Sequence, residues 1–364
     1  MSAALPEFPW DTLADAKALA CCHPDGIVDL SVGTPVDPVA PLIQKALAAA
    51  SAASGYPTTA GTARLRESAV AALDRRFGIT GLSEAAVLPV IGSKELIAWL
   101  PTLLGLGAAD LVVVPELAYP TYDVGARLAG AQVLRADSLT QVGPRTPALV
   151  YLNSPSNPTG RVLGVDHLRK VVGWARERGA LVASDECYLG LGWEVEPPGP
   201  LSLLHPAVCD GDHSGLIAIH SLSKSSSLAG YRAGLVAGDP ILVGELLAVR
   251  KHAGMMVPTP VQAAMVAALE DDDHERLQRE RYETRRAALL PALRSAGFTV
   301  DHSEAGLYLW ATRGEPSRDT VAWLAARGIL VAPGDFYGPG GGRHVRIALT
   351  ATDERLAAAV GRLS

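Results

Sequence analysis

The sequence has few cysteines, and their spacing does not suit a metal site or a disulfide framework. Cys21 and Cys22 are adjacent, Cys187 and Cys209 lie far apart, and no Cys-x-x-Cys pattern occurs in the 364 residues. His274 follows three aspartates, but a run of like charges at a helix junction is usually a solvated surface. We therefore expect no metal, reduced thiols and a cytoplasmic location.

Basic clusters and long apolar runs are also missing. The net charge of -6 comes without a Lys/Arg-rich segment, which argues against nucleic acid or an anionic membrane as a partner. No segment approaches 18 uninterrupted apolar residues, as a membrane span requires. Glu7, Asp11 and Asp15 precede any Lys or Arg, unlike the start of a signal peptide. The expected partner is a small molecule.

Apolar residues are abundant enough for a sizeable core. They make up 48% of a chain that is long enough for two domains, or for a large domain with a smaller lobe. Prolines 258 and 260 interrupt a helical pattern over 239–269. Short apolar runs, most of them with β-branched residues, predict strands at 27–30, 87–91, 111–114, 148–152, 180–185, 216–220, 307–310 and 345–349. Apolar periodicity predicts helices at 12–20, 41–53, 62–77, 95–104, 165–178 and 275–290.

One segment concentrates hydroxyl groups around a single amine. It runs from Ser221 to Arg232 and holds Lys224 among five serines, directly after an apolar strand. A lysine amine can condense with an aldehyde cofactor, and a guanidinium binds phosphate oxygens bidentately. Taken alone, this segment is explained equally well as a serine-rich surface turn and as a cofactor site.

Other predicted strands end at residues suited to a ligand. Gly92, Ser93 and Lys94 follow a strand and begin a helix, whose first N–H groups have no internal partner and therefore bind anions. Tyr119 follows another strand, where its ring can stack on a flat ligand. Asp185 ends an apolar strand and needs a cation, because an isolated carboxylate is costly to desolvate.

The order Ser-x-Ser-Lys, five residues, Gly-x-Arg resembles the lysine motif of the class I and II aminotransferases, which are fold-type I pyridoxal-phosphate enzymes. The resemblance implies pyridoxal 5'-phosphate as cofactor. It implies that Lys224 forms the Schiff base and moves the proton, and that Ser221, Ser223 and Arg232 hold the phosphate. The turn at 92–94 is expected to complete the phosphate site.

Matching motifs imply roles around the cofactor ring. Asp185 is expected to pair with the pyridine nitrogen, and Tyr188, three residues later, to hydrogen-bond the phenolic oxygen. Asn157, in an Asn-Pro-Thr-Gly turn, is expected at the same oxygen and at the substrate. Tyr119 is the expected stacking residue. Without the resemblance, Asn157 belongs to an ordinary turn.

Further matches concern the substrate and a second subunit. By the resemblance, Gly33 lies against the substrate carboxylate, and Arg346, inside an apolar strand, clamps that carboxylate bidentately. Tyr56 begins a Tyr-x-x-x-x-Gly segment whose tyrosine, in this family, reaches the cofactor phosphate of the partner subunit. The expected assembly is a homodimer with shared active sites.

The implied architecture is an α/β, aspartate-aminotransferase-like fold of type I. A large cofactor-binding domain, residues 41–255, is expected to contain a mostly parallel seven-stranded sheet. Residues 1–40 and 256–364 are expected to form a small α+β domain.

The substrates implied are an amino acid and a 2-oxo acid. Residues 253–256 lack the arginine that dicarboxylate-specific relatives use for the distal carboxylate. The short, Ala- and Gly-rich chain overall resembles the actinobacterial N-succinyldiaminopimelate aminotransferases of lysine biosynthesis, which use glutamate as amino donor. Arg250, Lys251 and His252 lie close by in sequence but need not reach the pocket. A pyridoxal-phosphate carbon–sulfur β-lyase and a non-enzymatic aminotransferase-like effector module remain alternatives, although such modules follow a DNA-binding domain that is not seen here.

Overall fold

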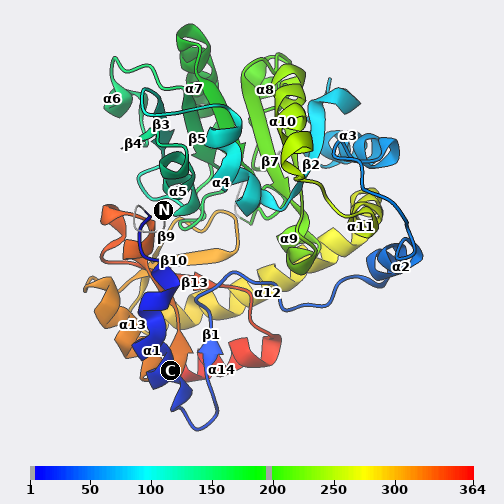
Figure 1. Cartoon of the computed structure of the whole chain (residues 1–364). Helices are drawn as coiled ribbons and strands as arrows, with labels where there is room; N and C mark the ends of the chain where they lie inside the picture. Colours follow the sequence, from blue (N-terminus) through cyan, green and yellow to red (C-terminus); the bar gives the residue numbers. More distant parts are fainter. Residues whose placement is uncertain (1–4, 194–198) are drawn as a thin grey trace.

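The computed structural model describes residues 5–193 and 199–364, and a seven-stranded sheet forms the centre of its larger part (Figure 1). Strand β8 runs antiparallel to both its neighbours, and the other pairs are parallel, which confirms the predicted mostly parallel sheet. In spatial order the strands are β2 (Val87–Ile91), β8 (Ala233–Gly238), β7 (Leu216–Ser221), β6 (Leu181–Asp185), β5 (Leu149–Asn153), β3 (Leu111–Val114) and β4 (Gln132–Arg135).

Both faces of this sheet are covered, because successive side chains of each strand point to opposite sides. In β5, Val150 and Leu152 join one core cluster, whereas Leu149 and Tyr151 join the other. The first cluster is completed by α2 (Pro41–Ala49), α3 (Ala63–Phe77), α6 (Leu139–Val142), α7 (Val165–Arg178), α8 (Pro206–Cys209) and α11 (Thr259–Glu270). The second is completed by α4 (Ser93–Leu103), α5 (Thr121–Leu128) and α10 (Pro240–Ala253).

The smaller part brings together the two ends of the chain. Strand β1 (Val28–Asp29) pairs in parallel with β11 (Ile329–Leu330). The antiparallel sheet beside them has the order β12 (Ala332–Pro333), β13 (Val345–Ala348), β10 (Tyr308–Thr312) and β9 (Thr299–Asp301). Its helices are α1 (Ala14–Cys21), α12 (Asp273–Ser295), α13 (Ser317–Ala325) and α14 (Asp353–Leu363). The 3-10 helices are η2 (Pro9–Leu13), η3 (Glu84–Ala86), η4 (Ala229–Tyr231), η5 (Gly334–Tyr337) and η6 (Pro339–Gly341).

Several helix ends differ from the prediction. Helix α2 stops at Ala49 rather than continuing to residue 53. Helix α3 begins one residue late because Thr62 is its N-cap and accepts a hydrogen bond from the Leu65 N–H. Helix α4 begins at Ser93, two residues early, so that Ser93 and Lys94 belong to its first turn.

The long helix α12 connects the two parts of the molecule (Figure 1). Its Tyr282 donates a hydrogen bond to the Lys224 carbonyl of α9 (Leu222–Ser225), a single turn in a segment expected to be a loop. Its Arg285 binds Asp37 at 2.6 Å and Asp353 at 2.8 Å. The proposed domain boundary at residue 255 stays a prediction; α11, which follows it, packs on α2 and α3 in the core of the large sheet.

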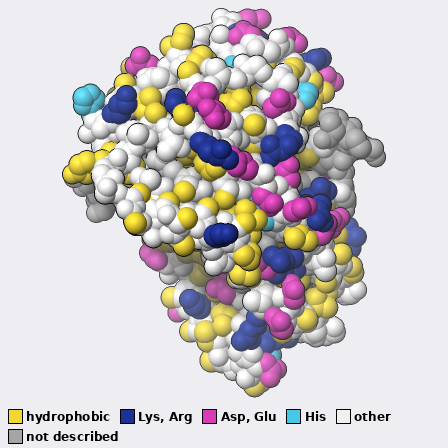
Figure 2. Space-filling model, turned by 90° about the vertical axis from the view of Figure 1, so that its right-hand side faces the viewer, with side chains coloured by type: hydrophobic (Ala, Val, Ile, Leu, Met, Phe, Trp, Pro, Cys, Tyr) yellow, Lys and Arg dark blue, Asp and Glu magenta, His cyan; other side chains and the backbone are white. Residues whose placement is uncertain are grey.

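On the side that carries α2, α3 and α11, basic and acidic side chains are interspersed with apolar ones (Figure 2). None of the helices in the described ranges is both long and apolar enough to cross a bilayer. His274, considered above as a metal ligand, instead hydrogen-bonds Asp271 and the Ser226 hydroxyl.

Candidate active site

A cavity of about 720 Å³ lies where the carboxyl ends of β6 and β7 face the small sheet. Ligands of open parallel sheets bind at this edge, because the loops after the strands diverge there. All predicted site residues except Gly92 and Tyr56 line this cavity, namely Gly33, Ser93, Lys94, Tyr119, Asn157, Asp185, Tyr188, Ser221, Ser223, Lys224, Arg232 and Arg346. Motifs that are far apart in the sequence therefore converge on one site.

Lys224 projects into this cavity from the single turn α9. The turn starts where β7 ends, because the Ser221 hydroxyl caps it by accepting a hydrogen bond from the Ser223 N–H at 3.1 Å. The Lys224 Nζ donates a hydrogen bond to the Gly33 carbonyl. Burial, together with the nearby Arg346 and Arg232, lowers the pKa of Lys224. A lowered pKa favours the neutral amine, which is the nucleophilic form.

A positively charged cradle adjoins Lys224. The first turn of α4 presents the free N–H groups of Ser93 and Lys94, and Arg232 lies beside them. Burial and the adjacent Arg232 lower the pKa of Lys94. Neither cation forms an ion pair with a residue of the described ranges. The Ser221 and Ser223 hydroxyls line the same cavity, so the cradle suits a phosphate.

Gly92 lies behind the cradle instead of lining it. Its backbone has φ +74°, which favours glycine, and a Cβ there would collide with the Arg232 guanidinium. Gly92 therefore leaves room for the Arg232 guanidinium, and its predicted contact with the cofactor stays a prediction.

Asp185 is 5% exposed at the end of β6. It accepts hydrogen bonds from the Tyr122 hydroxyl at 2.7 Å and the Cys187 N–H at 3.2 Å. Burial raises the pKa of Asp185, and these two hydrogen bonds oppose the rise. A carboxylate facing a cavity in this way is complementary to a protonated ring nitrogen. Tyr122 was missed because the sequence shows it only as an apolar helix residue after Pro120.

Arg346 is a buried cation without a carboxylate partner among the described residues. It is 2% exposed and donates to Asn157 Oδ1 at 2.9 Å and to the Ser31 carbonyl at 2.7 Å. Its Nε has no hydrogen-bond partner within the described chain. A buried charge of this kind is costly unless an anion joins it, so Arg346 suits a carboxylate ligand.

Two tyrosines form the side of the cavity next to Arg346. The Tyr188 and Tyr308 hydroxyls lie 3.1 Å apart, and the Arg346 guanidinium lies 4.0 Å from the Tyr308 ring centroid. A Cβ at Gly33 would collide with the Tyr308 hydroxyl, so only glycine fits that turn. Tyr308 was missed because it stands inside an apolar strand with no motif around it.

The N-terminal segment supplies a wall that the sequence did not reveal. Four residues line the cavity from here: Phe8, just before η2, Trp10 and Leu13 in η2, and Lys17 in α1. The ring centroids of Phe8 and Trp10 lie 5.6 Å apart with the rings tilted by 36°, and the Trp10 indole N–H donates to the Ser31 carbonyl at 3.4 Å. No sequence motif marks these residues. They reach the site only because the N-terminal segment folds back against the cavity.

Tyr56 lies outside the cavity. It follows α2 and is 97% exposed in the single chain. Its expected position is at a second subunit, so its role stays a prediction. Arg250, by contrast, is fully buried and paired with Glu95 at 3.0 Å, so it does not line the cavity.

The donor set fits pyridoxal phosphate. A phosphate cradle, an amine of lowered pKa, a carboxylate for a ring nitrogen and a tyrosine ring, Tyr119, line one cavity. Residues 25–363 match the family described as aminotransferase class I and II.

Individual proteins agree with this match. A probable aminotransferase of Mycobacterium tuberculosis is 83% identical over 100% of this chain and 86% of that protein. A 4-dedimethylamino-4-oxo-anhydrotetracycline transaminase of Streptomyces rimosus is 59% identical over 99% of each chain. The solved structure of a probable N-succinyldiaminopimelate aminotransferase from Thermus thermophilus is 30% identical and has a TM-score of 0.87, covering 98% of this chain and 99% of that one. The chain therefore belongs to the class I and II aminotransferases, enzymes that depend on pyridoxal phosphate.

Proposed function

We propose that this aminotransferase moves the amino group of N-succinyl-LL-2,6-diaminopimelate to 2-oxoglutarate, a reaction of lysine biosynthesis. The observation that carries this proposal is the distribution of cations in the cavity. Lys94 and Arg232 lie at the phosphate cradle and Arg346 at the small sheet, whereas Lys17 lies on the N-terminal wall. A long donor with a carboxylate at each end matches two separate cationic positions.

The residues at the end of the large sheet perform the chemistry in this proposal. Pyridoxal phosphate, when bound, supplies an electron-withdrawing ring that stabilises negative charge at the substrate α-carbon. Lys224 would hold the cofactor through its aldehyde carbon, and its amine would move the proton at the substrate α-carbon. Asp185 would hold the ring nitrogen protonated, and Tyr188 and Asn157 would donate hydrogen bonds to the ring oxygen.

Arg346 and Gly33 recognise what the two substrates share. The α-carboxylate binds the Arg346 guanidinium, whose position is fixed by Asn157 and Ser31. Gly33 keeps the Lys224 amine in place through its carbonyl and leaves space beside Tyr308. Both substrates of a transaminase carry this carboxylate, so these contacts serve each half of the reaction.

The N-terminal wall recognises where the substrates differ. Phe8 and Trp10 offer apolar surface for the chain of the succinylated donor, and Lys17 offers a charge for its terminal carboxylate. Glutamate is shorter and uses less of this wall.

The proposed assembly is a homodimer in which Tyr56 of one subunit reaches the phosphate cradle of the other. Its 97% exposure supports this proposal, since exposed large aromatic side chains often mark contact surfaces. Apolar side chains occur on the same side of the molecule (Figure 2).

A donor panel tests the proposed substrate. Purified holoenzyme receives 2-oxoglutarate with N-succinyl-LL-2,6-diaminopimelate, aspartate, an aromatic amino acid or cystathionine, and glutamate and pyruvate release are followed. Fastest glutamate release with the succinylated donor supports the proposal, whereas preference for aspartate or an aromatic donor overturns the substrate. Pyruvate from cystathionine without an acceptor favours a β-lyase.

A second candidate is amination of a bulky cyclic ketone. The Streptomyces relative, 59% identical, is named for a tetracycline derivative, and the aromatic rings of Phe8, Trp10 and Tyr119 line the cavity. To test this candidate, the enzyme receives a polycyclic ketone as acceptor and glutamate as donor, and 2-oxoglutarate release is followed. A rate of 2-oxoglutarate release higher than the rate of glutamate release with N-succinyl-LL-2,6-diaminopimelate favours this candidate.

A further inference from the structure

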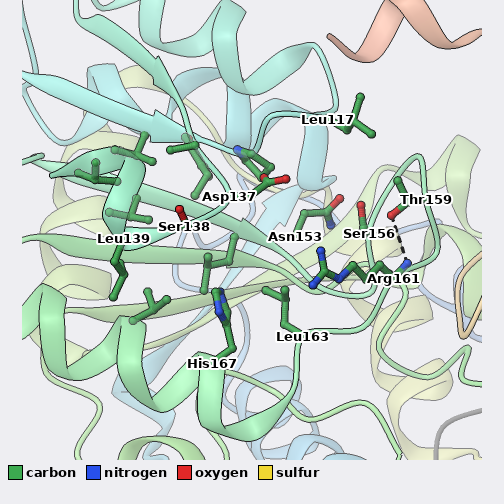
Figure 3. Close-up of a pocket in the computed structure, with 18 of the residues that line it drawn as sticks. Leu117, Asp137, Ser138, Leu139, Asn153, Ser156, Thr159, Arg161, Leu163 and His167 are labelled. Atoms are coloured by element: carbon green, nitrogen blue, oxygen red, sulfur yellow. Dashed lines mark hydrogen bonds between the residues drawn. The ribbon is translucent and has the colours of Figure 1, made fainter. Parts of the chain in front are cut away.

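A second cavity, of about 210 Å³, is lined in part by Asn153, Ser156, Thr159 and Arg161, from the end of β5 and the loop after it (Figure 3). It is bounded by the ends of β3 and β5, by α6 and by α7. None of its lining residues lines the active-site cavity. Asn153, Ser156 and Thr159 line this cavity, whereas Asn157 lines the active site, so one loop separates the two.

Most of the second cavity is apolar. Leu139, Val142 and Leu163 contribute aliphatic surface, and Val171 and Trp174 contribute the surface of α7. Its volume exceeds the ~150 Å³ of a dry engineered cavity that binds benzene. A single aromatic ring or a branched aliphatic chain therefore fits.

One side of the cavity is polar and can donate hydrogen bonds. The side chains of Arg161, Ser156 and His167 have no hydrogen-bond or ion-pair partner among the described residues. Figure 3 shows the Arg161 side chain extending toward Asn153 and Leu163, and His167 reaching from α7 toward the same space. Burial and the nearby Arg161 lower the pKa of His167, so the imidazole stays neutral near pH 7.

The acidic groups near this side are already engaged. Asp137 accepts a hydrogen bond from the Glu116 N–H at 2.9 Å. Glu304 accepts from the Val162 N–H at 2.7 Å and lies 3.7 Å from His302. The Arg161 guanidinium, which contacts neither carboxylate within 4.0 Å, is thus available to an anion.

Asn153 connects this cavity to the active site. Its Oδ1 accepts a hydrogen bond from the Asn157 N–H at 2.7 Å, and its Nδ2 donates to the Asp185 carbonyl at 3.0 Å. Asn157 in turn holds Arg346 at 2.9 Å. A ligand that shifts Asn153 therefore acts on both the ring-side and the carboxylate-side residues of the active site.

We propose that the second cavity is a regulatory site for a small carboxylic acid with an aromatic or branched aliphatic body. The body packs against Leu163 and Trp174, and the carboxylate binds the Arg161 guanidinium and the Ser156 hydroxyl. Binding changes turnover through Asn153. The proposal does not depend on which amino donor the enzyme uses.

Calorimetric titration of the holoenzyme with phenylacetate tests the site. The variant Arg161→Ala removes the charge, and Leu163→Trp fills the cavity. Each should weaken phenylacetate binding at least about tenfold, and Arg161→Lys should restore part of the lost affinity. Phenylacetamide, which lacks the charge, should bind at least about tenfold more weakly than phenylacetate. Absence of binding to the wild type, or unchanged binding to Arg161→Ala, overturns the proposal.

Two further measurements separate this site from the substrate pocket. Phenylacetate should bind the Arg346→Gln variant with the same affinity as the wild type. If the Arg346→Gln variant instead loses phenylacetate binding and the Arg161→Ala variant keeps it, the acid binds in the substrate pocket and the proposal is overturned. Saturating phenylacetate should change the turnover of the wild type and leave Arg161→Ala unaffected. Binding without any change in wild-type turnover overturns the regulatory role.

Discussion

The active-site cavity has two walls that are built differently. The inner wall, defined as Asn157, Asp185, Lys224 and Arg346, consists of polar groups held by the large sheet and β13, and Asp185 and Arg346 are only 5% and 2% exposed. The outer wall, defined as Phe8, Trp10, Leu13 and Lys17, comes from the N-terminal segment, where Phe8 is 52% exposed.

In the proposed function, the inner wall performs the chemistry and the outer wall selects the amino donor. Each inner-wall group is fixed by burial or hydrogen bonds, and a change there leaves a buried charge or donor without a partner. In the outer wall, Leu13 is buried, but Phe8 and Lys17 are exposed and have fewer such constraints, because exposed side chains are replaced at little cost to stability. We therefore expect inner-wall variants to affect every substrate and outer-wall variants to affect only some.

The largest effect is expected for Lys224→Ala. Turnover should fall at least about 10⁴-fold with every donor, because the variant loses both the covalent cofactor link and the proton-transfer group. Visible absorbance of bound cofactor and initial rates measure both losses. Lys251→Ala, at the end of α10, is the control and should behave as the wild type. Wild-type turnover by the Lys224 variant would contradict the inner-wall assignment.

Arg346→Gln should lower kcat/KM about 10²- to 10³-fold for both amino donor and 2-oxo acid, since both lose the carboxylate contact. Steady-state kinetics with each substrate varied in turn measure this loss. A lower kcat/KM for one substrate alone would indicate that Arg346 recognises a group that only this substrate carries, not the shared α-carboxylate.

A smaller loss, about tenfold in kcat, is expected for Tyr122→Phe. The change removes the hydrogen bond to Asp185 and so raises the pKa of that carboxyl further. Asp185 then holds the protonated ring nitrogen less well. The pH dependence of kcat should shift in the variant, and Tyr151→Phe, whose hydroxyl donates to the Ile97 carbonyl, provides a buried control that leaves Asp185 untouched. Equal losses in the two variants would point to packing.

The smallest effect is expected for Lys17→Ala on the outer wall. KM for the succinylated donor should rise about fivefold, as for an exposed ion pair, while KM for glutamate changes little. The rise should shrink at high ionic strength because salt screens exposed charges. An equal rise in KM for the succinylated donor and for glutamate would contradict the assignment of donor selection to the outer wall.

The sequence predicted the inner wall better than the outer wall for a physical reason. Asp185 ends β6, and Asn157 and Lys224 lie in the segments just beyond β5 and β7. The carboxyl ends of parallel strands meet at one edge of a sheet. Their positions thus follow from local patterns and the sheet. The outer wall depends on the return of residues 8–17 to the cavity, a long-range packing event that leaves no local pattern.

The supporting residues show the same limit. Tyr122 and Tyr308 look like ordinary core residues in the sequence, yet their hydroxyls contact Asp185 and Tyr188. Helix ends were displaced by caps such as Thr62, which is a common uncertainty of local patterns. Local chemistry therefore predicted groups that line the cavity, and only the three-dimensional packing shows what holds them.

A single-turnover measurement without acceptor tests the division between the walls most directly. The absorbance of the bound cofactor is followed after mixing with N-succinyl-LL-2,6-diaminopimelate or glutamate, using wild type, Lys17→Ala and Lys224→Ala. At subsaturating donor, we predict rapid conversion of the bound cofactor to its amine form in the wild type with both donors. Conversion should be slower in Lys17→Ala only with the succinylated donor, and should not occur in Lys224→Ala. Conversion by Lys224→Ala, or equal slowing of both donors by Lys17→Ala, would contradict the account.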